Sequence, residues 1–124
     1  MTMSSDEFGA VVEEALADLP ESFGPYLENV VIEVQLRPDE HVLHRAEIGD
    51  GRALLGIYIG RPLTEKSVEA VSAMPDRIIL FQRNLERACR TRRQLVAEIR
   101  KTVYHEIGHH FGLDEDDLDA LGYG

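Results

Sequence analysis

The stretch TRRQLVAEIRKTVYHEIGHHFG, residues 91–112, constrains the fold of this chain more than any other segment. Its apolar residues recur every three or four positions, which predicts a helix from about Thr91. Gly112 ends it, because glycine most easily adopts the left-handed conformation that follows a helix. The predicted core-facing stripe consists of Val96, Ile99, Val103, Ile107 and Phe111. The rest of the chain must therefore supply a layer that packs on this stripe.

The other segments predict that layer to be a small sheet with further helices. Residues 4–20 are typical of an amphipathic helix with a Ser or Asp cap and a stop at Pro20. Strands are expected within residues 29–36, with Val30, Ile32, Val34 and Leu36 on its buried face, and within residues 52–63 and 75–81. A polar loop or hairpin connection is expected over 37–51, and a second helix over 64–74. We therefore expect an α+β domain with a mixed sheet of about three to four strands.

Composition limits the function classes. A chain of 124 residues is expected to form a single domain, residues 1–124, and we expect a monomer. A net charge of -10 argues against nucleic acid as a partner, although eight basic residues against two acidic ones lie between Arg77 and Lys101, which is typical of a solvated helix face. The chain has no apolar run of membrane-spanning length and no signal-peptide pattern, so a cytoplasmic location is expected. The single cysteine, Cys89, excludes an internal disulfide and a Cys-based zinc finger.

A His-Glu-x-x-His motif lies in the last turns of the long predicted helix. His105 and His109 are one turn apart, within about 40° of each other, so both imidazoles point from one face toward one metal ion. They project opposite the apolar stripe, whereas Glu106 projects between the two faces and could reach a metal-bound water. The alternative is that all three side chains are simply solvated on an exposed helix face.

A catalytic zinc site normally has three protein ligands and an open position for water. Gly112 lets the chain reverse, and Glu115 is our candidate for the third ligand because it lies ten residues after the first histidine. Asp114 is a good N-cap for a final helix, and Asp117 takes the position of a capping-box acid. Asp116 therefore remains the second candidate ligand.

Other histidines and tyrosines have simpler interpretations. His110 falls on the apolar side of the helix, so we interpret it as a core histidine and not as a ligand. His41 and His44 lie in a polar segment and are expected at the surface. Tyr104 and Tyr123 are candidate stabilisers of an oxyanion, but partial packing is the favoured interpretation for both.

The segment from His105 to Glu115 resembles the zincin motif His-Glu-x-x-His-x-x-Gly-x-x-His/Asp. Together with LLGIYIGRPLT, PDRIILFQRNL and the terminal LGYG, it resembles the small bacterial zincin-like family of zinc metallopeptidases, the minimal zincins. The resemblance covers nearly all of the chain after about Asn29. It implies a compact zincin-like domain, with the motif helix beneath a small mixed sheet, and bound Zn²⁺. That family more often has aspartate at the place of Glu115.

These features predict a zinc-dependent metallopeptidase that hydrolyses peptide bonds. Glu106 would act as the general base, taking the proton of a zinc-activated water and passing it to the leaving amine. A peptide substrate would bind along the strand GIYIG, where Gly56 and Gly60 allow close backbone approach, in a shallow cleft. Two alternatives are a non-catalytic zinc-binding or partner-binding scaffold, and a metal-free protein whose acidic tail DEDDLD contacts a basic partner.

Overall fold

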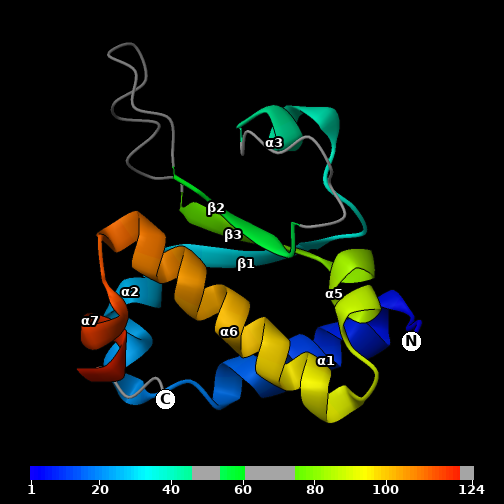
Figure 1. The fold of residues 1–124 in the computed structure, drawn as a ribbon, viewed down its shortest axis with the longest axis horizontal. Coiled ribbons are helices and arrows are strands. Elements are labelled where there is room, and N and C mark those ends of the chain that lie inside the picture. The colour runs from blue at the N-terminus through cyan, green and yellow to red at the C-terminus, as the bar shows by residue number, and fades with distance from the viewer. Residues whose placement is uncertain (46–53, 61–74, 121–124) are drawn as a thin grey trace.

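The computed structural model describes residues 1–45, 54–60 and 75–120 (Figure 1). The predicted helix over 64–74 lies outside these residues. The elements, in chain order, are α1 (Ser5–Ala17), η1 (Glu21–Phe23), α2 (Gly24–Leu27), β1 (Val30–Gln35), α3 (Glu40–Arg45), β2 (Gly56–Ile59), β3 (Asp76–Phe81), α5 (Gln82–Ala88), α6 (Arg92–Phe111) and α7 (Glu115–Ala120). None of these helices is long and apolar enough to span a membrane.

The three strands form one mixed sheet in the order β1-β3-β2. β1 runs parallel to β3, with Ile32 opposite Ile78, and β2 runs antiparallel to β3, with Tyr58 opposite Ile78. β2 is therefore an edge strand, as expected for GIYIG. The combination of helices with a small mixed sheet confirms the predicted α+β class.

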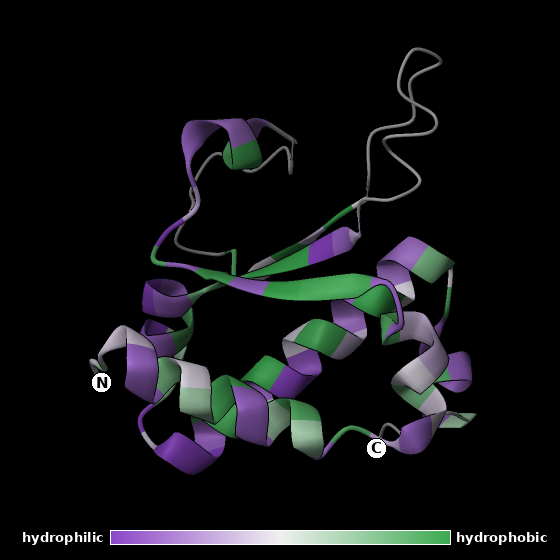
Figure 2. Ribbon diagram, turned by 180° about the vertical axis from the view of Figure 1, so that it is seen from behind, coloured by the Kyte–Doolittle hydropathy of each residue, from purple (hydrophilic) through white to green (hydrophobic). Residues whose placement is uncertain are grey.

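Both faces of the sheet are covered. The lower face packs on α6 and α1, which cross beneath it, and α3 lies above the upper face (Figures 1 and 2). The strands are strongly hydrophobic, as Figure 2 shows. The main core contains Phe8, Val11, Val12, Ala15, Phe23, Ile78, Leu80, Leu85, Cys89, Leu95, Val96, Ile99, Val103, Tyr104, Ile107 and Leu118. A smaller cluster above the sheet contains Val42, Ile59, Ile79 and Phe81.

The bounds of the long helix agree with the prediction. The Thr91 side chain accepts a hydrogen bond from the Gln94 N–H at 3.1 Å, which satisfies a backbone donor of the first turn of α6. The helix ends where Gly112 adopts a left-handed conformation with φ of 66°. Ser4 caps α1 in the same way by accepting from the Glu7 N–H at 3.2 Å. Local capping chemistry therefore sets the ends of both helices.

Two segments differ from the prediction. The expected loop over 37–51 contains the helix α3, because the Asp39 carboxylate accepts from the Val42 N–H at 2.8 Å and Val42 is buried in the upper cluster. The remainder of that segment, from residue 46, lies outside the described residues. A helix that was not predicted, α5, follows β3 directly. Capping and burial at α3 override the polar, turn-rich pattern of the sequence there, whereas α5 has no side-chain cap and buries Gln82, Asn84, Leu85 and Glu86.

Three apolar residues predicted to be buried are exposed. Val34 and Leu36 are exposed, because β1 is a sheet edge and only its first half packs against the main core, through Val30 and Ile32. Phe111 is 43% exposed. It is the last residue of α6, and its ring remains at the surface, with its centroid 5.1 Å from that of the Tyr26 ring.

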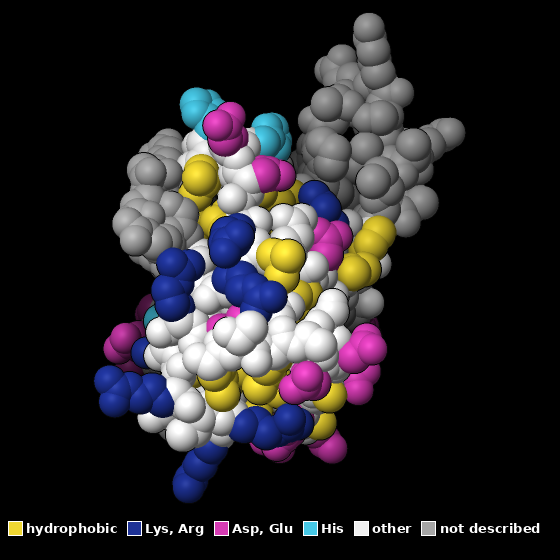
Figure 3. Space-filling view, turned by 90° about the vertical axis from the view of Figure 1, so that its right-hand side faces the viewer, with side chains coloured by type: hydrophobic (Ala, Val, Ile, Leu, Met, Phe, Trp, Pro, Cys, Tyr) yellow, Lys and Arg dark blue, Asp and Glu magenta, His cyan; other side chains and the backbone are white. Residues whose placement is uncertain are grey.

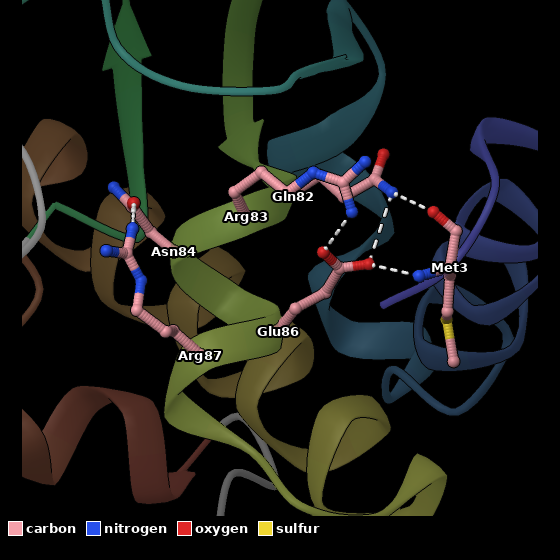
Figure 4. A network of polar contacts seen from close by, with 6 residues as sticks. All are labelled: Met3, Gln82, Arg83, Asn84, Glu86 and Arg87. Atoms are coloured by element: carbon pink, nitrogen blue, oxygen red, sulfur yellow. Dashed lines mark hydrogen bonds and ion pairs between the residues drawn. The ribbon is translucent and has the colours of Figure 1, made fainter. Parts of the chain in front are cut away.

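A buried acid connects the N-terminus to α5 (Figure 4). The Glu86 side chain is only 2% exposed and accepts hydrogen bonds from the Met3 N–H at 2.8 Å, from Arg83 at 2.7 Å and from Gln82 at 3.3 Å. Burial by itself raises the pKa of this carboxyl, but these three hydrogen bonds outweigh burial, and the pKa lies below its ordinary value. Glu86 is therefore a charged structural residue.

On the face that Figure 3 shows, Lys and Arg side chains lie among Asp and Glu side chains. Four of the arginines between Arg77 and Lys101 form ion pairs: Arg77 with Glu33, Arg83 with Glu86, Arg92 with Glu14 and Arg100 with Asp18. Three of the four pairs join different elements, which agrees with a solvated, ion-paired face.

Candidate metal and catalytic site

The C-terminal half of α6 presents the motif as its periodicity predicts. Val103 and Ile107 face the main core and are fully buried. His105 and His109 are exposed on the other side of the helix, one turn apart. Glu106 is half-buried, between the core and the exposed face. The helix thus combines a core-packing face with an open pair of imidazoles.

Glu106 contacts the edge strand. Its carboxylate oxygen Oε1 accepts a hydrogen bond from the Tyr58 backbone N–H at 3.2 Å. Burial raises the pKa of this carboxyl above its ordinary value, against the smaller opposing effects of the Tyr58 hydrogen bond and of His109. A half-buried carboxyl with a raised pKa is a candidate for acid–base chemistry.

Helix α6 and strand β2 run alongside each other in a matching repeat. Thr102 lies against Gly56, Glu106 against Tyr58, and His110 against Gly60. Four residues advance about 6 Å along a helix, and two residues advance about 6.6 Å along a strand. Every fourth residue of α6 therefore lies opposite every second residue of β2. The site is therefore built on two rigid elements.

Close packing at one end of this contact requires a glycine. A Cβ at Gly56 would lie 2.7 Å from the Thr102 Cγ2 atom and 3.0 Å from the Ile79 carbonyl oxygen. At Gly60 a Cβ would only make ordinary contact with His110, at 3.5 Å. Gly56 therefore allows α6 to approach β2 closely, and the approach of a peptide backbone to Gly56 and Gly60 stays a prediction.

A shallow groove of about 210 Å³ lies beside the motif at the start of β2. Its lining comes from β2 and the segment before it and from the exposed side of α6: Leu55, Gly56, Glu98, Lys101, Thr102, His105 and Glu106. The groove therefore joins the edge strand to one of the two motif histidines and to the candidate base.

The third candidate ligand lies on the helix that follows the motif. Glu115 is exposed in the first turn of α7. The predicted capping box is confirmed, because Asp114 accepts from the Asp117 N–H at 2.8 Å and Asp117 accepts from the Asp114 N–H at 3.0 Å. These two acids are thereby engaged, whereas Asp116 is exposed beside Glu115.

The donor set fits a zinc ion in part. Two exposed imidazoles one helical turn apart match the nitrogen ligands that zinc prefers. Within residues 1–45, 54–60 and 75–120, however, no three side chains of His, Cys, Asp or Glu come together as a metal-binding group. His105, Glu106 and His109 lie on the last turns of α6, and Glu115 and Asp116 lie in the first turn of α7.

The remaining candidate residues are assigned by their surroundings. Tyr104 is 2% exposed and its ring packs edge-on against Phe23 at 4.4 Å, which confirms the packing interpretation. Tyr123 lies outside the described residues. His41 and His44 are exposed, as predicted, although they lie on α3.

His110 is not the core histidine that its position on the helix predicts. Its side chain is 38% exposed and stacks on the ring of Tyr58, with centroids 3.9 Å apart and planes 12° apart. The last turn of α6 extends beyond the main core and meets the edge strand there, so the apolar side of the helix faces an aromatic ring at the surface. Sequence reasoning missed the role of Tyr58, for which the only signal is an aromatic residue between two glycines of a candidate edge strand.

Comparison with known proteins agrees with this geometry. A sequence model of the zincin-like metallopeptidase family matches residues 27–124. The match includes β1, β2, β3, α6 and the whole motif, and the chain belongs to this family. A search of curated proteins found no match.

Proposed function

We propose that this protein is a zinc-dependent peptidase, with zinc held by His105, His109 and a carboxylate and with Glu106 as the general base. Glu115 is the proposed carboxylate ligand, and Asp116 is the second candidate. The observation that carries the proposal is the position of Glu106. Its carboxyl lies between an exposed histidine pair and an edge strand, at the border of a groove. If the motif residues were only solvated, the Glu106 carboxyl would be expected to point into water. It is instead half-buried, has a raised pKa and points toward that strand.

A zinc ion bound there would supply a Lewis acid that lowers the pKa of water and polarises a peptide carbonyl. Glu106 Oε1 accepts from the Tyr58 N–H, which orients the carboxyl and leaves Oε2 to accept a proton from the attacking water. The same oxygen would then deliver this proton to the nitrogen of the leaving amine.

The edge strand is the proposed binding surface for the peptide. In an antiparallel pair, hydrogen-bonded and non-hydrogen-bonded residue pairs alternate. Leu55 accepts from the Phe81 N–H at 3.0 Å, so Gly56 and Tyr58 occupy non-hydrogen-bonded positions opposite β3. The backbone groups of Gly56 therefore point away from β3, where an extended peptide can add as a further strand. Gly56 also lines the groove, which places such a peptide beside Glu106.

The experiment compares wild type with Glu106→Gln and with the control Glu13→Gln. Glu13 is an exposed glutamate on α1, so its substitution makes the same chemical change far from the motif in sequence and on another element. Zinc content is measured by elemental analysis after dialysis, and cleavage of a mixed peptide library is followed by mass spectrometry. We expect equal zinc in all three proteins and cleavage by wild type and Glu13→Gln only. Absence of zinc from the wild type would refute the metal site.

A non-catalytic zinc-binding scaffold is the second candidate function. The observation that favours it is that, among the described residues, no group of three or more metal-binding side chains is present. Equal zinc in wild type and Glu106→Gln, with no cleavage by either, would favour this function and direct the search to a binding partner.

A further inference from the structure

Tyr58 is the residue through which the edge strand holds Glu106, and its side chain is anchored on both sides. Its backbone N–H donates to Glu106. Its phenolic hydroxyl donates to Asp76 Oδ2 at 2.7 Å, at the start of β3. Its ring stacks on His110, whose Nε2 lies 3.8 Å from the same Asp76 oxygen. One side chain therefore joins the edge strand, the neighbouring strand and the motif helix.

These contacts form a closed network between the helix and the strands. Glu106 and His110 are one turn apart on α6, so both project toward β2. His110 contacts the ring of Tyr58, and Glu106 accepts from the backbone N–H of the same residue. A movement of the Tyr58 ring away from His110 would therefore also move the Tyr58 N–H relative to the Glu106 carboxylate. Asp76 fixes the outer end of that ring by accepting a hydrogen bond from its hydroxyl.

We propose that Tyr58, held by Asp76 and His110, is the positioning residue for Glu106. The inference rests on the proposed function of Glu106, which the zincin-like motif alone does not connect to Tyr58, Asp76 or His110. A glutamate has three side-chain torsions, and a base that is free to rotate loses the alignment on which proton transfer depends. A strand anchored at the ring of Tyr58 keeps the N–H donor in place and thereby selects one orientation of the carboxylate. Loss of the anchor lets the strand move while the motif remains complete.

The first test measures amide hydrogen exchange by NMR on the full chain as purified. Tyr58 occupies a non-hydrogen-bonded position opposite Ile78, so its N–H points away from β3 and donates to Glu106. Ile57 alternates with it and bonds within the sheet, which makes the Ile57 amide an internal control. Tyr58→Phe removes only the phenolic oxygen, His110→Ala removes the stacked ring, and His110→Phe replaces it with another ring.

We expect the residue-58 amide to exchange about tenfold faster in Glu106→Ala and in His110→Ala, and several-fold faster in Tyr58→Phe. His110→Phe should recover most of the lost protection, and Ile57 should change by less than about twofold in every variant. Unchanged exchange at residue 58 in Tyr58→Phe and His110→Ala would overturn the proposal. Equal acceleration at residues 57 and 58 would also overturn it, because the anchor would then only stabilise the strand.

The second test is kinetic and uses the same variants. Tyr58→Phe should lower kcat by about tenfold, with KM within about twofold and zinc content unchanged, because orientation of the base acts on the chemical step. An effect on KM alone would assign Tyr58 to substrate binding and overturn the positioning role. If the wild type hydrolyses no peptide, the proposed function fails, while the exchange data still decide whether Tyr58 positions Glu106. If the wild type is active and residue 58 is unaffected, only the positioning role fails.

Discussion

Replacement of Gly56 by alanine tests the packing of the edge strand on the motif helix. The added Cβ would lie 2.7 Å from Thr102 Cγ2 and 3.0 Å from the Ile79 carbonyl oxygen. Real Cβ atoms essentially never approach other atoms below 3.0 Å, so β2 or Thr102 must shift. Thr102 cannot simply rotate away, because its side chain is buried and its hydroxyl donates to the Glu98 carbonyl at 2.8 Å.

The size of the effect follows from two opposing contributions. Overpacking of a well-packed site costs about 1–3 kcal/mol. The loss of glycine's extra conformational freedom in the unfolded chain returns about 0.5–1 kcal/mol. We therefore expect Gly56→Ala to lower the free energy of unfolding by about 1–2 kcal/mol, measured by urea denaturation. The strand would also move off the helix, so the Tyr58 N–H would be drawn away from Glu106.

Two further variants make this prediction specific. Thr102→Ser removes the methyl group that Gly56→Ala would meet but keeps the hydroxyl, so the double variant should recover part of the loss, with a coupling of about 1 kcal/mol. Gly9→Ala, in a helix where a Cβ meets nothing within 4 Å, should be neutral or stabilising. A Gly56→Ala protein as stable as Gly9→Ala, or a double variant with no coupling, would refute the proposed steric contact.

The remaining predictions concern the site, the buried acid and the helix end. His105→Ala or His109→Ala should each lower bound zinc by more than about tenfold by elemental analysis, and Glu115→Ala should lower it less; unchanged zinc in both histidine variants would exclude the site. Glu86→Gln should cost about 2 kcal/mol near neutral pH. The pKa of Glu86 in the folded protein is below its ordinary value of 4.5, so this contribution is complete above about pH 4.5 and is lost on further acidification. Urea titrations should therefore show that the difference in unfolding free energy between wild type and Glu86→Gln becomes smaller as the pH falls. A difference that stays constant would contradict the assignment. Gly112→Ala should cost about 1–2 kcal/mol in the same assay, since φ there is 66°, and an unchanged midpoint would refute the strain.

Local patterns in the sequence determined the motif helix and much of the fold class. Thr91 and Gly112 define the ends of α6 through interactions within a few residues. The apolar residues from Val96 to Ile107 recur with the helical period, so they lie on one face of the helix, and that face is buried whichever element covers it. The capping box of Asp114 and Asp117 is likewise local. For these features the interacting groups are neighbours in the chain, so spacing alone predicted them.

Only the tertiary structure decided how the motif is held. The hydrogen bond from Tyr58 to Glu106 joins residues 48 apart, and no period in the sequence encodes which strand lies beside α6. The position of His110 shows the same limit. Its angle on the helix predicted burial, but the last turn of α6 extends past the core and meets an edge strand. Side-chain surroundings at the end of a helix depend on the neighbouring elements, and their arrangement is set by packing of the whole domain.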